Sequence, residues 1–359
     1  MKKSTNKDSP EVIKAKTSPI PISKISEAGY IAMELSTQGL LGAPKVFHIR
    51  NFDSTDILKL ALSEDEDLPK KVSEMLDQLI QEDDVSVADF HEKEVIETLV
   101  RLYKSFYASS IKNVDFNLEE EDFEFLREKY KNDLTAYQTM INDLRDGNWK
   151  PKFDIDLDLI ETYDIDAETF KSDVTIVNTR TNFSCAFTWP RYGDVLALKD
   201  FINVNFKLRD KQFAKLKEIY QFRKSEENRL RKGENVNLAK IPDLGEDDRK
   251  KLIEYETEKA VFSAKALKAL HLKNINGIDL TEMNLKERMT YANDPRLDYT
   301  LMKKVNEYYA NMKVGLIDEI TIFNPIKEAV EKRKYTFRLL DLFQAIKLYE
   351  ADELVIRPE

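Results

Sequence analysis

The side chains that most often perform catalysis or bind metals are scarce in this chain. Across 359 residues it has one cysteine, Cys185, and three histidines, His48, His91 and His271. Zinc sites need Cys and His ligands at short spacings, and a Cys or Ser nucleophile needs a base within reach. Each histidine stands alone: His48 in an expected strand, His91 at a helix entrance and His271 at a helix end. We therefore expect packing or capping histidines, and no catalytic site built on them.

Carboxylates are the abundant group that could do chemistry, because the chain has 66 Asp and Glu residues. Asp154, Asp156 and Asp158 alternate with apolar residues and would lie on one edge of a strand, where divalent cations could bind. Calcium loops, however, place such residues around a glycine and end on a glutamate, and no glycine lies in this segment. We predict a solvated strand face. A carboxylate-dependent or metal-dependent enzyme remains the alternative function.

Nucleotide-binding and membrane-spanning patterns are missing from the sequence. The nine glycines form neither GxGxxG nor GxxxxGK[ST], and Gly39-Leu40-Leu41-Gly42 predicts a turn. A net charge of −10 argues against general binding to duplex DNA. No apolar run approaches the roughly 20 residues that span a bilayer. We expect a soluble chain made in a reducing cytoplasm, with no cofactor, no metal, no nucleic-acid partner and no membrane partner.

Length and composition predict two or three packed units, since the chain is 42% hydrophobic and 34% charged. The expected fold class is α+β: mainly helical, with short antiparallel hairpins at 27–50, 173–190 and 317–338 and a central-to-C-terminal helical bundle. The expected domains are a disordered basic arm (1–24), an N-terminal hairpin with short helices (25–118), an acidic helix with a β-hairpin (119–192), a helical domain (193–315) and a C-terminal β-hairpin with a tail (316–359).

Apolar periodicity and turn residues place the elements. Helices are expected at 57–62, 68–80, 87–108, 119–145, 194–232, 246–271, 280–292 and 298–312. Further strands are expected at 112–118, 154–159, 317–323, 334–338 and 353–357. In the arm, Ser18-Pro19-Ile20-Pro21 is expected to stay outside any ladder, because proline lacks the N–H donor. The lysine-rich arm and the first hairpin are predicted to form a partner-binding surface.

An ordered set of short patterns resembles one known family. Gly39-Leu40 with Pro44 precedes a strand that ends at Arg50, and the amphipathic helix Val95–Tyr107 leads into a strand at Val114–Asn117. Trp189-Pro190-Arg191 with Asp194 then enters a helical domain, which ends at Gly315-Leu316-Ile317-Asp318 before a closing hairpin. This order is similar to that of the baseplate-hub assembly proteins of contractile-tailed bacteriophages of the T-even type. The likeness covers most of residues 27–340.

The chain departs from that family at its metal-binding positions. Members of the family often carry Cys-Pro-x-Cys knuckles that hold zinc, one after the first helical unit and one in the closing hairpin. Here Asn324-Pro325-Ile326-Lys327 keeps the proline, but Asn324 and Lys327 stand where the thiolates would be. A protonated lysine cannot bind zinc, and asparagine is a poor ligand. We therefore expect the zinc to be lost, and expect segments 112–118 and 317–338 to be held together by apolar contacts.

The resemblance implies a non-enzymatic protein that acts in tail or baseplate-hub assembly through protein–protein contacts. Its expected partners are other phage tail or baseplate-hub proteins, and its expected location is the host cytoplasm during assembly or the virion tail. The oligomeric state is left open. A cellular helical adaptor unrelated to phage is the other alternative, and gene neighbourhood would separate it from a tail protein.

Overall fold

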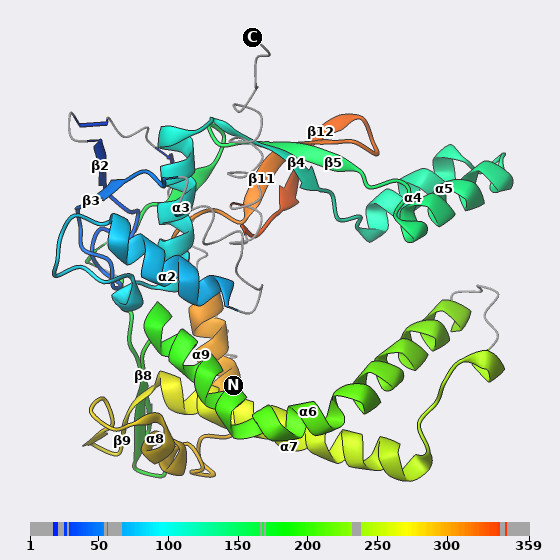
Figure 1. Cartoon of the computed structure of the whole chain (residues 1–359). Helices are drawn as coiled ribbons and strands as arrows, with labels where there is room; N and C mark the ends of the chain where they lie inside the picture. Colours follow the sequence, from blue (N-terminus) through cyan, green and yellow to red (C-terminus); the bar gives the residue numbers. More distant parts are fainter. Residues whose placement is uncertain are drawn as a thin grey trace, which may run out of the picture. The chain divides into compact units, whose positions relative to one another are not determined.

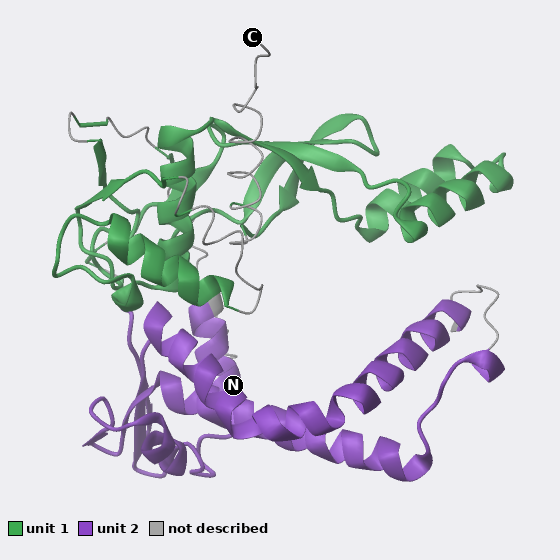
Figure 2. Cartoon of the chain, in the orientation of Figure 1, with its two compact units in different colours: residues 1–170, 311–359 green, residues 171–310 purple. Residues whose placement is uncertain are grey.

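The computed structural model confirms the α+β class and describes residues 17–20, 25–26, 29–53, 56, 67–165, 167–168, 170–231, 238–337 and 342 (Figure 1). Two compact units divide the chain (Figure 2). Unit 1 contains residues 1–170 and 311–359, and unit 2 contains the intervening residues 171–310. The predicted elements at 57–62 and 353–357 and most of the arm at 1–24 lie outside the described residues.

Unit 1 begins with two small antiparallel pairs. The predicted first hairpin is confirmed, with β2 (Tyr30–Met33) paired to β3 (Phe47–Arg50). The expectation for Ser18 and Pro19 was wrong, because β1 (Thr17–Pro19) pairs with β6 (Glu161–Tyr163). Such a short edge pair tolerates a proline, since its missing N–H need not face the partner strand. Ile20, the next residue, is buried.

The helices of the N-terminal region follow the apolar periodicity. They are α2 (Leu68–Leu79) and α3 (Glu92–Phe106), which is preceded by the short 3₁₀ turn η1 (Val87–Asp89). The single helix predicted at 87–108 is therefore divided at Phe90. The division arises because His91 is extended and caps α3: its Nδ1 accepts the Lys93 N–H, and the Glu94 carboxylate accepts the His91 N–H.

Two helices replace the one predicted at 119–145: α4 (Glu120–Lys129) and α5 (Leu134–Asp146). The helix is interrupted before α5 because the Asp133 carboxylate accepts the Ala136 N–H at 2.9 Å and so caps the start of a new helix. α4 and α5 lie side by side and project from the strands of unit 1 (Figure 1).

Four strands form the rest of unit 1. β4 (Ser110–Asp115) pairs with β5 (Lys152–Asp156), and β11 (Glu319–Asn324) pairs with β12 (Ala329–Lys334). β11 also lies beside β5 (Figure 1). β5 ends earlier than predicted because the Asp156 carboxylate accepts the Asp158 N–H in a turn. The predicted strand at 334–338 was misplaced, since the ladder with β11 ends at Lys334.

The sheet of unit 2 has four antiparallel strands in the order β10-β9-β8-β7. The predicted hairpin at 173–190 supplies β7 (Val174–Asn178) and β8 (Phe183–Phe187). The missed strands are β9 (Leu272–Ile275) and β10 (Ile278–Asp279), which follow a helix directly. Their hairpin packs on β8 and buries Phe183, Cys185 and Phe187 with Leu272.

The helices of unit 2 begin with an antiparallel pair, α6 (Tyr192–Arg231) and α7 (Glu246–His271), with the short η2 (Leu238–Lys240) between them. Their facing sides bury a row of aromatic rings, including Phe206, Phe213 and Tyr255. α8 (Leu285–Tyr291) and α9 (Tyr299–Asn311) complete the unit. α8 starts five residues later than predicted because Asn284, not Leu280, caps it. Among all described residues, no helix has the length and apolar character to cross a membrane.

Candidate functional site

The turn at the end of β11 contains the first of the two predicted knuckle positions. Asn324 is completely buried, and its side-chain oxygen accepts the N–H groups of Ile326 at 2.7 Å and Lys327 at 3.1 Å. This arrangement is an Asx turn, in which a side-chain oxygen fixes the backbone that follows it. Asn324 therefore shapes the tight connection between β11 and β12 through its carbonyl oxygen alone.

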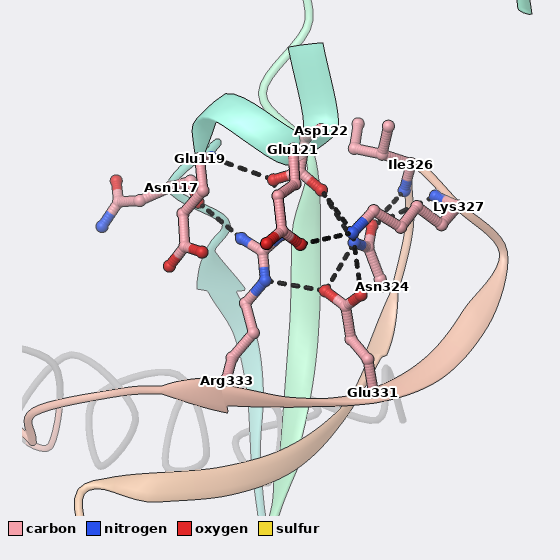
Figure 3. A network of polar contacts seen from close by, with 9 residues as sticks. All are labelled: Asn117, Glu119, Glu121, Asp122, Asn324, Ile326, Lys327, Glu331 and Arg333. Atoms are coloured by element: carbon pink, nitrogen blue, oxygen red, sulfur yellow. Dashed lines mark hydrogen bonds and ion pairs between the residues drawn. The ribbon is translucent and has the colours of Figure 1, made fainter. Parts of the chain in front are cut away.

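The amide nitrogen of Asn324 serves a second purpose. It donates to Asp122 Oδ1 at 3.0 Å and to Glu331 Oε1 at 2.7 Å (Figure 3). Asp122 lies in the first turn of α4, 202 residues earlier in the chain, and Glu331 lies in β12. One buried side chain thus joins a helix to both strands of the closing hairpin.

Arg333 holds the other side of Asp122. Its guanidinium donates to Asp122 Oδ2, to Glu331 Oε1 at 2.7 Å and to the backbone carbonyl of Asn117 at 3.0 Å. It also lies over the ring of Phe116, 4.4 Å from the centroid. The predicted proximity of segments 112–118 and 317–338 is therefore confirmed. A polar network crosses between them.

Lys327, the second knuckle position, completes this network. Its ammonium lies 3.1 Å from Glu331, 3.6 Å from Asp122 and 3.7 Å from the exposed Glu121. Two buried or half-buried carboxylates, Asp122 and Glu331, thus face two cations, Lys327 and Arg333 (Figure 3). We call Asp122, Asn324, Lys327, Glu331 and Arg333 the polar staple.

The polar staple stabilises the charged forms of its carboxylates. Burial raises the pKa of Asp122, but hydrogen bonds from Arg333, the Glu119 backbone and Asn324 outweigh it and leave that pKa below its ordinary value. The pKa of Glu331 is likewise lowered, because its hydrogen bonds from Asn324, Lys327 and Arg333 outweigh desolvation. Acids held in the ionised form by hydrogen-bonded cations are suited to structural cross-linking, and poorly suited to proton transfer at neutral pH.

A groove lies beside the staple. It has a volume of about 680 Å³ and runs between the helices α4 and α5 and the turn that follows Asn324. Its apolar lining includes Tyr130, Met140, Trp149, Pro325 and Ile326, and its charged lining consists of Lys129, Asp133, Asp143 and Glu328. None of the residues of α5, all of which the structure describes, is buried. The groove therefore exposes half of an amphipathic helix beside an acidic margin.

The other predicted motif, Pro190-Arg191 with Asp194, belongs to unit 2 and shapes a helix start. Pro190 is buried, and the Asp194 carboxylate accepts the Arg191 N–H at 3.3 Å in the first turn of α6. An acidic residue there also suits the positive end of the helix dipole. Arg191 and Asp194 thus cap α6 within unit 2, whereas the polar staple lies in unit 1.

Asp154 of β5 and Asp158 in the turn after it are engaged separately. Asp154 pairs with Lys112 at 2.8 Å, and Asp158 pairs with Lys104 at 3.0 Å. Across the described residues, no group of three or more His, Cys, Asp or Glu side chains is arranged to hold a metal ion. Cys185 is buried in the core of unit 2, where burial raises the pKa of its thiol to about 11. A thiol that stays protonated is a weak nucleophile.

The histidines have structural surroundings. His91 caps α3, which confirms the capping prediction, and His48 Nδ1 lies 2.7 Å from the Glu82 carboxylate. His271 packs against Tyr309, and burial lowers its pKa. The Gly39–Gly42 turn is also confirmed. A Cβ on Gly42 would lie 1.9 Å from the Asp89 carbonyl oxygen, so the chains approach too closely for any other residue.

Sequence reasoning missed the buried carboxylate of Glu94, which anchors this turn. Glu94 accepts hydrogen bonds from the Thr37 hydroxyl and from the backbone N–H groups of Gly42, Ala43 and His91. Burial raises the pKa of Glu94, although these hydrogen bonds oppose the shift. A raised pKa occurs in catalytic acids, but here the donors surround both oxygens, so the carboxylate serves as an internal anchor.

Sequence reasoning also missed Asp122, Glu331 and Arg333 as members of the polar staple. The alternation of Glu331 and Arg333 along β12, facing one side, was the available signal. Comparisons with models of known protein families, with curated proteins and with solved structures gave no match.

Proposed function

We propose that this protein is a non-enzymatic component of bacteriophage tail or baseplate-hub assembly that acts through protein–protein contacts. The phage assignment rests on the ordered sequence patterns from Gly39 to Asp318. Contact as the mode of action rests on one structural observation, the groove between α4, α5 and the turn at Pro325-Ile326.

The lining of the groove suits a protein segment. Tyr130, Met140, Trp149 and Pro325 provide apolar and aromatic surface of the kind that anchors protein interfaces. Three carboxylates against one lysine give the margin a net negative charge. The segment that fits best therefore carries apolar side chains next to Lys or Arg.

The polar staple supports this role by fixing one wall of the groove. Asn324 and Asp122 tie the Pro325-Ile326 turn to the N-terminus of α4, and both side chains are completely buried. A preformed wall lowers the ordering cost of binding. In this proposal, hydrogen bonds and ion pairs within the chain take the place of the zinc that the family resemblance would put at this turn.

The test is affinity capture from infected cells with a matched pair of variants. Met140→Arg places a charge and a longer side chain in the groove, and Gln138→Arg places the same side chain at an exposed position of α5 outside the lining. We expect the native chain and Gln138→Arg to recover tail or baseplate proteins, and Met140→Arg to recover at least tenfold less.

Two results would overturn the proposal. One is normal tail formation by a phage in which this gene is disrupted. The other is a metal-dependent activity of the purified chain that is lost on changing Asp154, Asp156 or Asp158 alone, which would establish the enzymatic alternative. Location of the gene away from tape-measure and baseplate genes would favour a cellular adaptor.

A further inference from the structure

The outward face of α7 carries an apolar stripe that the rest of unit 2 leaves exposed. Its members recur at alternating intervals of four and three residues: Ile253, Thr257, Ala260, Ala264 and Leu267. This is the interval at which one helix buries a seam against another. Ile253 is 49% exposed and Leu267 is 46% exposed, and Val261 beside the stripe is 59% exposed.

The opposite side of α7 already has its partner, so the stripe is not part of the α6–α7 contact. Tyr255, Phe262 and Lys259 face α6, where they meet Phe213, Phe206 and Asp210. At 100° per residue these positions lie about half a turn from the stripe. The α7 stripe (Ile253, Thr257, Ala260, Ala264 and Leu267, with Val261) is therefore a second helix-packing face.

Charge along α7 changes sign at the middle of the stripe. Residues Glu246–Glu258 include six acidic and three basic residues, whereas Lys259–His271 include three lysines and no acidic residue. Acids at the first turn and bases at the last are explained by the helix dipole. Glu256, Glu258 and Lys259 are explained by ion pairs with α6. Glu254 lies well beyond the first turn and Lys265 lies before the last, so the dipole does not explain these two.

We infer that α7 binds α7 of a second copy of this chain in antiparallel orientation, about a two-fold axis near Ala260 and Val261. Such pairing puts Glu254 of each copy near Lys265 of the other, and it puts the small residues Thr257, Ala260 and Ala264 where the helix axes come closest. A two-fold interface uses the same patch on both copies, so one self-complementary stripe is sufficient. This inference does not depend on the proposed function.

The first test is the mass of the full chain in solution between about 1 and 100 μM, the range in which a small interface associates. We expect a concentration-dependent dimer. Val261→Asp should weaken it about tenfold or more. Val204→Asp is the matched control, because Val204 is 76% exposed on the outward face of α6, and it should leave the dimer unchanged. Circular dichroism should show the same helix content in both variants.

Charge reversal and cross-linking test the orientation. Glu254→Lys and Lys265→Glu should each weaken the dimer, and the double variant should restore it. In antiparallel pairing, two copies of position 253 lie about 21 Å apart, from 14 residues at 1.5 Å each. A short bismaleimide should therefore join Ile253→Cys chains to Leu267→Cys chains and should not join Ile253→Cys chains to each other. The native Cys185 is buried, and the unaltered chain gives the background.

Three outcomes would overturn the inference. They are a monomer throughout the concentration range, a dimer that Val204→Asp dissociates while Val261→Asp does not, and efficient cross-linking of Ile253→Cys to itself, which would indicate parallel pairing.

Discussion

At the scale of single residues, the polar staple depends most on Asn324, because one amide both accepts and donates in a buried position. Its oxygen closes the turn, and its nitrogen reaches Asp122 and Glu331. Sequence reasoning found the position through the Asn-Pro-x-Lys pattern and predicted that it does not bind zinc. It did not find the carboxylate partner, because Asp122 lies 202 residues away and no local pattern links the two.

We expect Asn324→Ala to lower the free energy of unfolding by about 2–4 kcal/mol, since it removes the turn contact and leaves buried polar groups unpaired. Asn324→Asp separates the two effects. It retains an acceptor for the turn, but it loses the donor and faces two carboxylates, so it should be destabilising as well. Urea unfolding at pH 7 measures both. Equal stability of the native chain and Asn324→Asp would show that the nitrogen contributes nothing.

The lowered pKa of Asp122 gives the staple a defined pH dependence. The unfolded-state value is near the ordinary 3.8, and the folded-state value lies below it. The stabilisation from the ionised carboxylate is therefore fully present above about pH 4 to 5 and is lost as the pH falls through the lowered folded value.

Asp122→Asn should cost about 3–5 kcal/mol at pH 7, because it removes one of the two carboxylates, Asp122 and Glu331, that neutralise the buried Arg333. The difference from the native chain should shrink as the pH falls below 3.8. Asp154→Asn is the control, because Asp154 forms an exposed ion pair that contributes about 0–1 kcal/mol. Urea unfolding at several pH values measures this, and a pH-independent difference for Asp122→Asn would contradict it.

At the scale of elements, local signals were sufficient for the first two hairpins and for the long helices α6 and α7, but they misplaced β12 in the closing hairpin. The strands at 174–178 and 183–187 are joined by a short connection, and those at 30–33 and 47–50 by a longer one that contains Gly39, Gly42 and Pro44. Strand pairing across long separations was not predictable in this way. β9 reaches β8 across the whole α6–α7 pair, and β5 pairs with β4 across α4 and α5, so only tertiary packing selects these neighbours.

In unit 1, an aromatic row connects β5 with the residues that follow β4 and β12. Phe116 meets Phe153 with centroids 5.9 Å apart, Phe153 meets Tyr335 at 5.8 Å, and Tyr335 meets Phe337 at 5.1 Å. All three contacts are edge-to-face, which adds to the burial of the rings. The row therefore helps to hold together segments that lie far apart in the sequence.

Phe337→Ala should lower the free energy of unfolding by about 3–5 kcal/mol, because Phe337 is buried at the end of this row. Phe337→Asp should leave the chain unfolded or aggregated. Phe323→Ala is the matched control, since this phenylalanine of β11 is 56% exposed, and it should change stability by about 0.5 kcal/mol or less. Thermal and urea unfolding compare the pair, and equal effects at the two positions would exclude the aromatic row as the main contact.

At the scale of the whole molecule, unit 2 is a continuous segment that interrupts unit 1. It has its own sheet and three apolar clusters, which lie between β8, β9 and α9, between α6, α7 and α8, and along the α6–α7 pair. Unit 1, in contrast, needs both of its chain segments, 1–170 and 311–359, because Asp122 and Asn117 bind residues of the closing hairpin. The two units therefore differ in what a truncation would remove.

We expect residues 171–311, which include α9 to its last residue, to fold without unit 1. The reason is that the paired strands of the β7–β10 sheet and the helices packed on it all lie inside this segment. The fragment should show a helical circular dichroism spectrum and one cooperative urea transition. The complementary fragment 1–170 should be less stable than unit 1 in the full chain, because it leaves Asp122 without Arg333 and Asn324. The prediction would be contradicted if fragment 171–311 did not unfold cooperatively while fragment 1–170 was as stable as unit 1 in the full chain.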